Sequence, residues 1–347
     1  MRVLVIADPR LPVPPVNYGG IERIVHLLCQ GLKQRGHIVD LMAGKGSMSY
    51  GGRLVIHKAP TLAYPSRAFR KLWFQWLSLT MLSDIDVVVN FGRVDYLELI
   101  LKTGIPLICI FENPVYQREI DFLLDRRKRK NLTFIGISKS QIRHFKLLEL
   151  FTVIYNGIDL DSFDFIKQPT KSYSYLVFLG RLTQNKGVDT AISVAQATGI
   201  LLKIAGNIPQ NEGDRHFFET NIKPKLGYGC EWVGPVDDRQ KNELLGNALA
   251  LLFPIRWDEP FGIVMIESLA CGTPVIATRF ASTPEVVDHG KTGFLCDSVN
   301  DMIEAVKNIH TIDRFACRQA VEESFSADVM TEKYLDVISR TVRSSIQ

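Results

Sequence analysis

Short apolar runs alternate with amphipathic stretches along the whole chain. A short apolar run bounded by turn residues predicts a buried strand, because helices cover both faces of a parallel sheet. The runs in the first half predict strands at 3–7, 38–43, 54–57, 85–90, 107–111, 133–137 and 152–155. After a polar stretch, the same pattern predicts strands at 175–179, 201–205, 231–233, 249–253, 274–277 and 294–296.

The stretches between these runs have the spacing of helices. The first of them repeats apolar residues every three or four positions, at Ile21, Ile24, Val25, Leu28 and Leu32. This spacing places them on one helix face, and Gly36 stands where a left-handed residue ends a helix. The tail from 326 to 343 predicts one more helix.

Two successive series of strands and helices predict two doubly wound α/β domains. We expect an N-terminal domain at 1–157, a linker at 158–174 and a C-terminal domain at 175–325, with a helix at about 326–347 packed back on the first domain. Ligands of open parallel sheets bind beyond the carboxyl ends of the strands. We therefore expect the site in the cleft across which the two sheets face each other.

Composition narrows the class of protein. The 347 residues are 46% hydrophobic and 22% charged, which is typical of a globular protein rather than a disordered one. Forty-one basic residues against 37 acidic ones leave a net charge of +4, too mild to predict a nucleic-acid partner. The six cysteines lie far apart, which argues against a disulfide scaffold and fits a reducing compartment.

Neither a transmembrane helix nor a signal peptide is predicted. No apolar run reaches the ~18–20 residues that a membrane-spanning helix needs. The apolar run at the N-terminus is too short for a signal peptide and predicts a strand. We expect a cytoplasmic protein, and a peripheral position on the inner face of the plasma membrane stays open.

The first candidate motif is Gly19-Gly20, which follows the Pro-rich loop after strand 3–7 and opens a helix. Two glycines let backbone amides approach an anion, and a helix N-terminus adds partial positive charge. The alternative is a flexible turn without a ligand. The Gly-x-Gly-x-x-Gly fingerprint of dinucleotide-binding dehydrogenases is absent, which disfavours that class.

The second candidate is the turn 180–187, directly after strand 175–179. It carries two cations, Arg181 and Lys186, at the carboxyl end of a strand. Such a pair can hold a diphosphate and stabilise it as a leaving group. The alternative is a solvated polar turn.

The third candidate is the segment 257–274. Pro260 suits a first helical turn and Gly272 suits a helix end, so Glu259 stands just before a helix and Glu267 within it. Eight helical residues span about 12 Å, comparable to the reach from sugar to ribose in a sugar nucleotide. Because apolar neighbours surround Glu267, we expect it to have a specific partner; the alternative is an exposed charge.

At these residues the chain resembles glycosyltransferase family 4. Glu259 and Glu267 match its E-x7-E motif, within Glu-x-Phe-Gly and Glu-Ser-Leu-Ala-x-Gly-Thr-Pro-Val. The segments 180–187, 156–159 and 19–22 resemble its diphosphate loop, its linker motif and its N-terminal glycine loop. The order and spacing fit along essentially the whole chain.

The resemblance implies a GT-B fold and retaining sugar transfer from a nucleotide sugar without a bound metal. The N-terminal domain would be the acceptor side and the C-terminal domain would bind the nucleotide sugar. Arg181 and Lys186 would hold the diphosphate, Glu267 the ribose, and Glu259 the donor sugar. Backbone amides would add contacts to sugar and phosphates, at Phe261, Gly262, Ile263, Gly19 and Gly20.

Two departures from the family pattern stand out. Many members carry a His after the strand that here occupies 107–111, and this chain has Glu112-Asn113 instead. We expect Glu112 to act as a base or to bind a sugar hydroxyl, with Asn113 as a substrate contact. Many members also have Gly-Gly before a Pro-Glu segment, where this chain has Ala281-Ser282.

We therefore expect a hexosyltransferase that uses a nucleotide-diphosphate sugar, with UDP-glucose as the first choice. The acceptor would be a saccharide or a lipid-linked one, in polysaccharide, exopolysaccharide or glycoconjugate synthesis. Two alternatives stay open. One is a nucleotide-sugar-binding protein with lost or only hydrolytic turnover, and the other is a nucleotide-sugar 2-epimerase on the same fold.

We expect no cofactor and no metal. The Asp-x-Asp spacing of metal-dependent transferases occurs at Asp84/Asp86 and Asp159/Asp161, but one pair leads into a strand and the other lies in the predicted linker. Neither has the oxygen-rich neighbourhood that Mg²⁺ prefers.

Two basic segments bear on the acceptor side. The run 126–130 ends a predicted helix, and 69–77 mixes basic and aromatic residues at helical spacing. Together they could hold the protein on an anionic leaflet. A solvated face for the first and a core-facing helix for the second are the alternatives.

Overall fold

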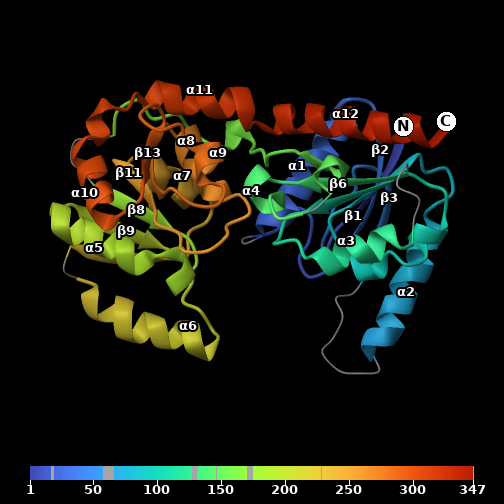
Figure 1. Cartoon of the computed structure of the whole chain (residues 1–347), viewed down its shortest axis with the longest axis horizontal. Coiled ribbons are helices and arrows are strands. Elements are labelled where there is room, and N and C mark those ends of the chain that lie inside the picture. The colour runs from blue at the N-terminus through green and yellow to red at the C-terminus, as the bar shows by residue number, and fades with distance from the viewer. Residues whose placement is uncertain are drawn as a thin grey trace. The chain divides into compact units, whose positions relative to one another are not determined.

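The computed structural model describes residues 1–16, 19–57, 66–126, 131–145, 147–169, 175–227 and 229–346. The chain divides into two compact units (Figure 1). Unit 1 comprises Met1–Gly157 and Ala327–Gln347, and unit 2 comprises Ile158–Ser326.

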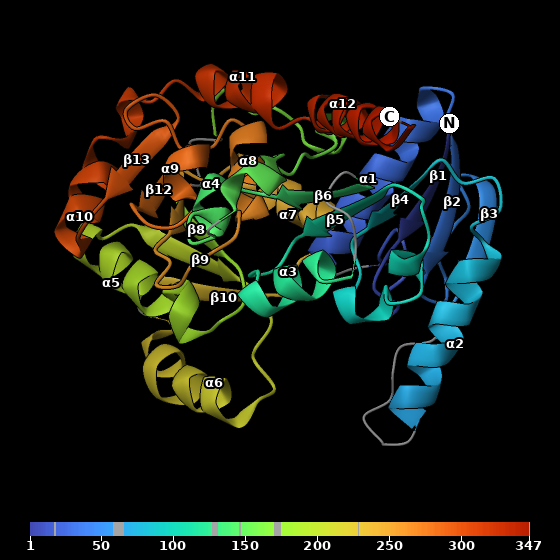
Figure 2. The same cartoon turned by 45° about the vertical axis from the view of Figure 1, so that its right-hand side comes forward.

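Unit 1 is built on a parallel seven-stranded sheet in the order β3-β2-β1-β4-β5-β6-β7. Its strands are β1 Arg2–Ile6, β2 Ile38–Ala43, β3 Gly51–Ile56, β4 Val87–Asn90, β5 Leu107–Phe111, β6 Leu132–Gly136 and β7 Phe151–Val153. All seven predicted strands of this half are confirmed, with ends shifted by three residues or fewer. The central strands are fully buried because helices cover both faces of the sheet (Figure 2).

The helices of unit 1 include one from the far end of the chain. They are α1 Gly20–Gln34, α2 Ser66–Thr80, α3 Gln117–Leu124, α4 Lys139–Ile142 and α12 Ala327–Ile346, with short 3-10 turns at Val94–Tyr96, Ile100–Lys102 and Leu148–Leu150. Helix α12 packs on α1 so closely that a Cβ at Gly31 would lie 2.4 Å from Thr331 Oγ1. Arg35 pairs with Asp328 at 3.0 Å and with Glu332 at 2.6 Å, which fixes this contact.

Unit 2 is built on a parallel six-stranded sheet in the order β10-β9-β8-β11-β12-β13. Its strands, all predicted, are β8 Tyr175–Leu179, β9 Leu201–Ala205, β10 Cys230–Gly234, β11 Ala250–Phe253, β12 Val275–Thr278 and β13 Gly293–Cys296. Its helices are α5 Val188–Thr198, α6 Glu212–Phe217, α7 Asp238–Gly246, α8 Ile263–Ala270, α9 Thr283–Val286, α10 Val299–Lys307 and α11 Arg314–Ser324. Shorter turns occupy Leu160–Ser162, Gln184–Lys186, Phe218–Ile222, Lys223–Lys225 and Ile309–Thr311.

Each sheet reverses its strand order at one point, which is where parallel sheets bind ligands. In unit 1 the reversal lies between β1 and β4, and in unit 2 between β8 and β11. The predicted doubly wound architecture is confirmed in both units. The segments that follow β8 and β11 carry the second and third candidate motifs.

The predicted linker differs from the structure. Its described part, 158–169, belongs to unit 2, and residues 170–174 lie outside the described residues. Two arginines hold it there: Arg318 Nη1 donates to Phe163 O at 2.8 Å, and Arg314 Nε donates to Ile166 O at 2.7 Å. Hydrogen bonds to distant side chains leave no pattern in the local sequence.

The start of α8 also differs from the expectation. Pro260 lies outside the helix, which begins at Ile263 after the N-cap Gly262. The reason is that Gly262 has a φ of +84°, which lies outside the helical range. The helix ends as predicted, with Gly272 at a φ of +84° after the last turn.

Ala281 is in the left-handed region, with a φ of +54°. It lies in the turn between β12 and α9, at the position where many family members have glycine. The next residue is held by burial and by a hydrogen bond. Ser282 is fully buried, and its Oγ donates to Phe261 O at 2.8 Å. The turn therefore holds Ala281 in a conformation that a Cβ makes unfavourable.

We expect Ala281→Gly to raise the free energy of unfolding of unit 2 by about 0.5–1 kcal/mol and Ala281→Val to lower it. Glycine removes the Cβ penalty of a positive φ, although its greater freedom in the unfolded chain offsets part of the gain. Denaturant titration of both variants measures this. A loss of stability in Ala281→Gly would contradict the strained turn.

Among the described helices, none is long and apolar enough to cross a membrane.

Candidate active site

The loop after β8 approaches its neighbours too closely for any residue but glycine at two points. A Cβ at Gly187 would lie 1.9 Å from Pro254 O, and one at Gly206 would lie 1.9 Å from Gly180 O. This close packing places Arg181 and Lys186 at the carboxyl end of β8. Arg181 is exposed, and no acidic side chain among the described residues pairs with it.

Lys186 and Glu259 come together with Trp257 in one cluster. Lys186 Nζ donates to Glu259 Oε2, and Trp257 Nε1 donates to the same oxygen at 2.7 Å. Lys186 Nζ also lies 5.0 Å from the centroid of the Trp257 ring. The side chains of Lys186 and Glu259 are 15% and 11% exposed, so this ion pair is largely shielded from water.

This cluster determines how charge is distributed over the loop. The carboxylate of Glu259 compensates the charge of Lys186, whereas Arg181 is uncompensated. An anion near the loop would therefore meet the full charge of Arg181 and the remaining protons of the Lys186 ammonium. The sequence analysis gave Trp257 of the third motif no role. Its position two residues before Glu259 is the sequence signal that could have indicated a contact between the two side chains.

Glu267 has the specific partner that its apolar surroundings predict. It lies on α8 and is 8% exposed, and Lys241 Nζ of α7 donates to its Oε1 at 2.5 Å. Lys241 also lies 3.4 Å from Asp238 Oδ1. Within the described chain no side chain donates to Glu267 Oε2, which leaves that oxygen as an acceptor. The sequence analysis missed Lys241, because nothing in the pattern of α7 indicates which acid it meets.

The loop between Glu259 and Glu267 presents backbone rather than side chains. The side chain of Phe261 is 1% exposed and packs on Phe325, with ring centroids 5.9 Å apart. Gly262 caps α8, and a Cβ there would lie 2.9 Å from Phe253 Cζ. At a helix start the first amides have no partner within the helix. The amides around Gly262 and Ile263 are thus suited to an anion.

In unit 1 the described part of the glycine loop is close-packed at the start of α1. A Cβ at Gly19 would lie 2.7 Å from Pro15 Cβ and 2.8 Å from Glu22 Oε2, so only glycine fits. Gly20 is the first residue of the helix. Glu22 is 7% exposed, and burial raises its pKa above the ordinary value. Residues 17–18 lie outside the described residues.

Glu112 follows β5 and is a partly buried carboxyl without an ion pair among the described residues. Its Oε2 accepts a hydrogen bond from Asn156 Nδ2 at 2.8 Å. Its Oε1 is buried and finds no partner in the described structure, and the same holds for Asn156 Oδ1 and the Tyr334 hydroxyl. These three orphaned atoms come from the turn after β5, from the end of the first segment of unit 1, and from α12.

The pKa of Glu112 is raised to about 7, and burial is the largest cause. The hydrogen bond from Asn156 lowers this pKa, and the nearby Glu22 carboxylate raises it. Tyr334 is fully buried, and desolvation together with the charge of Glu112 raises its pKa well above the ordinary value. The sequence analysis assigned no role to Tyr334 or to the side chain of Asn156. A tyrosine on a helix near the C-terminus carries no local sign that it lies near a residue after β5.

Asn113 differs from its neighbour. Its side chain is on the surface, and its backbone carbonyl accepts from Gln141 Nε2 at 2.8 Å. Gln141 Nε2 also donates to Phe111 O at 2.7 Å, so one amide of α4 holds both ends of the turn that presents Glu112.

The remaining sequence features have structural roles or lie outside the described residues. Asp86 Oδ2 accepts from Arg2 N at 2.7 Å, and Asp159 Oδ1 caps a 3-10 turn by accepting from Asp161 N at 3.1 Å. Within the described ranges, no three His, Cys, Asp or Glu residues cluster in a way that could hold a metal. Residues 127–130 of the basic run lie outside the described ranges.

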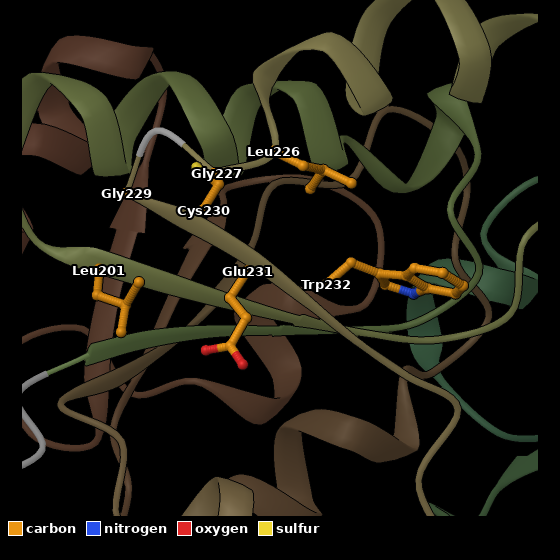
Figure 3. Close-up of a pocket in the computed structure, with 7 residues that line it drawn as sticks. All are labelled: Leu201, Leu226, Gly227, Gly229, Cys230, Glu231 and Trp232. Carbon is orange, nitrogen blue, oxygen red and sulfur yellow. The ribbon is translucent and has the colours of Figure 1, made fainter.

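A shallow pocket in unit 2 contains none of the candidate residues (Figure 3). It is lined by residues that include Leu201, the first of β9, and Cys230, the first of β10. Amino ends of strands lie opposite the ligand-binding edge of a parallel sheet. The candidate site is therefore the set of loops at the carboxyl ends and not this pocket.

Two family models match the chain in succession. The model "Glycosyltransferase Family 4" matches residues 18–162, and the model "Glycosyl transferases group 1" matches residues 161–313.

Two relatives match over part of their length. A Klebsiella pneumoniae protein named "Uncharacterized 41.2 kDa protein in cps region" is 29% identical over 217 residues, covering 58% of this chain and 56% of the relative. A glycogen synthase of Mycobacterium tuberculosis is 32% identical over 151 residues, covering 42% of this chain and 36% of the relative. The chain thus spans less than two thirds of the length of either relative.

Solved structures match over nearly the whole chain. The glycosyltransferase AviGT4 of avilamycin A biosynthesis aligns with a TM-score of 0.74 at 22% identity, covering 99% of this chain and 98% of that one. Anabaena HepE in complex with UDP and glucose aligns with a TM-score of 0.73 at 16% identity, covering 98% of this chain and 99% of that one. At these identities the likeness concerns the fold alone, which is the predicted GT-B fold with two Rossmann-like domains. The two family models together cover residues 18–313, and on that ground the chain belongs to glycosyltransferase family 4.

Proposed function

We propose that this protein is a retaining hexosyltransferase that moves a sugar from a nucleotide-diphosphate sugar to a saccharide or lipid-linked acceptor. The observation that carries the proposal is the arrangement of two lysine-paired carboxylates, Glu259 and Glu267, on either side of the N-terminus of α8. One carboxylate is suited to the sugar and the other to the ribose. The helix start between them is suited to the phosphates.

UDP-glucose is the first candidate donor. Support comes from the fold shared with HepE, whose structures contain UDP-glucose or UDP with glucose. Polysaccharide, exopolysaccharide or glycoconjugate synthesis is the setting that the proposed acceptors suggest.

In the proposed reaction, the bond between the anomeric carbon and the diphosphate oxygen breaks, and the diphosphate leaves with the electron pair. The oxygen of an acceptor hydroxyl then bonds to the same face of that carbon, and the proton of this hydroxyl passes to Glu112 as the proposed base. Arg181 and Lys186 would stabilise the charge that develops on the diphosphate, which is the electrostatic work that a metal performs in other transferases. We therefore propose that turnover does not depend on a metal.

Glu112 would serve the acceptor side of the reaction. Its buried Oε1 has no partner in the described chain, so it is available to accept a hydrogen bond from a sugar hydroxyl or to take its proton. With a pKa of about 7, the carboxyl changes its protonation state near neutral pH, as a general base requires.

A nucleotide-sugar-binding protein with lost or only hydrolytic turnover is the second candidate function. It is favoured by one observation, the carboxylate of Glu112 where family members commonly have an imidazole. Incubation of the protein with a UDP-sugar and candidate acceptors distinguishes the two. A glycosylated acceptor supports the transferase, whereas free sugar or unchanged donor supports the second candidate.

We expect Arg181→Ala to lower the rate of transfer about 10²–10³-fold, the effect of removing one transition-state donor. Arg181 is exposed and unpaired among the described residues, so the variant should fold normally. Arg215→Ala, on the exposed surface of α6, is the matched control and should keep full activity. Both assays are run with and without EDTA. Near-normal turnover of Arg181→Ala would exclude its role at the leaving group.

We expect the two glutamates of the motif to differ in their effect on free UDP. Glu267→Gln should weaken binding of UDP roughly tenfold to a hundredfold, because the ribose hydroxyls lose a charged acceptor and keep only a neutral amide oxygen. Glu259→Gln should bind free UDP at least as well as the native protein, since Lys186 loses its compensating charge, yet it should lose transfer. Calorimetry with UDP measures both. Equal losses in the two variants would contradict the assignment.

We expect Glu112→Gln to change the pH dependence of both stability and activity. A carboxyl whose pKa is raised from 4.5 to about 7 by folding makes the folded state bind more protons than the unfolded state. Stability therefore falls as pH rises from about 4.5 to 7, by up to about 3 kcal/mol in total. The glutamine variant should lack this fall and be more stable than the native protein at pH 8, but not at pH 4.5.

The rate of transfer should respond to pH in the opposite direction if the ionised form of Glu112 acts as the base in sugar transfer. The rate of the native protein should then rise through about pH 7, and that rise should be absent in Glu112→Gln. Thermal melting and transfer rates across pH 4.5–8.5 measure both properties. An unchanged rate profile would show that Glu112 has no part in proton transfer.

A further inference from the structure

Three buried oxygens of unit 1 come from distant parts of the chain and have no hydrogen-bond partner among the described residues. They are Glu112 Oε1 after β5, Asn156 Oδ1 at the end of the first segment of the unit, and the hydroxyl of Tyr334 on α12. Buried polar groups are normally hydrogen-bonded, and a buried group without a partner costs free energy. The three atoms therefore call for a common partner if they lie together.

Several contacts bring the three side chains to one place. Asn156 Nδ2 donates to Glu112 Oε2 at 2.8 Å, so the two unpartnered oxygens of these residues belong to adjoining groups. Helix α12 meets the same segment, because Gly157 N donates to Met330 Sδ at 3.2 Å. Tyr334 lies four residues after Met330, which places both on one face of the helix. Desolvation and then the charge of Glu112 raise the pKa of Tyr334, so the two groups lie within electrostatic reach of each other.

The ring of Tyr334 is fixed in the interior of unit 1. The residue is fully buried, and its ring centroid lies 6.4 Å from that of Phe91. Phe91 directly follows β4, and β4 pairs with β5 in the sheet. The tyrosine is therefore held near the carboxyl ends of these two strands, where the turn that carries Glu112 begins.

The hydrogen-bonding capacity of the three groups matches one water molecule. The ionised carboxyl of Glu112 and the side-chain carbonyl of Asn156 are acceptors, and the Tyr334 hydroxyl is a donor. A water molecule has two protons for the acceptors and a lone pair for the hydroxyl, and about three hydrogen bonds are typical of a buried water. A sugar hydroxyl has one proton for two acceptors, and a metal ion would leave the tyrosine proton without an acceptor.

We propose that Glu112 Oε1, Asn156 Oδ1 and the Tyr334 hydroxyl hold one buried water molecule, through which Tyr334 acts as a positioning residue for the Glu112 carboxyl. The water site itself does not depend on the proposed sugar transfer, whereas its effect on the transfer rate rests on that proposed function. Each carboxylate oxygen can accept two hydrogen bonds, so the water leaves a position on Oε1 for an acceptor hydroxyl.

The water also supports the ionised form of Glu112. The Tyr334 hydroxyl polarises a water that donates to the carboxylate, and a hydrogen bond to the charged form favours that form. The other influences on Glu112 are unchanged by Tyr334: burial raises its pKa, the Asn156 hydrogen bond lowers it, and Glu22 of α1 raises it. Lys333 of α12 is exposed, with its Nζ 5.9 Å from the centroid of the Tyr155 ring. Loss of the tyrosine hydroxyl should therefore raise the pKa of Glu112.

The variant Tyr334→Phe tests the water site by the sign of its effect on stability at pH 8. If the hydroxyl bonds to water, the variant loses a hydrogen bond, and its unfolding equilibrium constant should rise about two- to tenfold. If the hydroxyl has no partner, the variant escapes the cost of burying it, and the constant should fall. Denaturant titration of the full chain measures the constant. The matched control is Tyr175→Phe, whose lost hydroxyl donates to Leu244 O at 2.8 Å in unit 2, so its constant should rise.

The pH dependence separates positioning of Glu112 from a general structural role. The fall of stability with pH ends near pH 7 in the native chain, because the folded-state pKa of Glu112 is about 7. In Tyr334→Phe this fall should extend about 0.5–1 pH unit higher, and the rise of the transfer rate should shift by the same amount. In Tyr175→Phe neither profile should shift.

A high-resolution crystal structure of the native chain provides a readout that does not depend on how the variant folds. One water should lie about 2.5–3.0 Å from all three oxygens. Absence of that water, a lower unfolding constant in Tyr334→Phe, or an unshifted stability profile would each overturn the proposal. If the water is present and stability responds as expected while no sugar is transferred, the water site is supported and the proposed function fails.

Discussion

The close approach of the loops after β8 and β11 is the constraint on which the candidate site of unit 2 depends. Because Gly187 has no side chain, its backbone can lie against the carbonyl of Pro254. Arg256 N then donates to Asn185 O at 2.8 Å, which joins the two loops through their backbones. Arg256 adds an ion pair with Asp189 at 3.0 Å. Only with the loops joined in this way can Lys186 meet Glu259, since the two belong to different strand ends.

The three carboxyl groups of the candidate site lie in two kinds of environment. Glu259 and Glu267 are each held by a lysine, which orients them as hydrogen-bond acceptors. Glu112 has an amide as its partner and no cation among the described residues, so burial dominates and its pKa lies near 7. The same functional group thus has a cationic partner in unit 2 and a neutral amide partner in unit 1.

The end of the chain is part of unit 1 and contributes to the surroundings of Glu112. Helix α12 is held against α1 by Arg35 and brings Tyr334 into the interior. The hydroxyl of Tyr334 is buried with no partner in the described structure, and the same holds for Oδ1 of Asn156 and Oε1 of Glu112. Buried polar groups are normally hydrogen-bonded, so orphaned atoms in one unit indicate places where water or ligand atoms are accommodated.

By itself, the sequence determined the alternation of strands and helices, the two sheets and the positions of Glu259 and Glu267 around a helix start. These features follow from local periodicity and from glycines and prolines whose backbone preferences are intrinsic. Only the tertiary structure decided that Lys241 meets Glu267, that Tyr334 is buried in the unit that contains Glu112, and that α8 starts after Gly262. It also decided which apolar face of α2 is buried, because Phe74 and Trp73 are adjacent in the sequence and equally hydrophobic. Periodicity identifies a face but not the surface that it meets, and that surface is formed by residues far away along the chain.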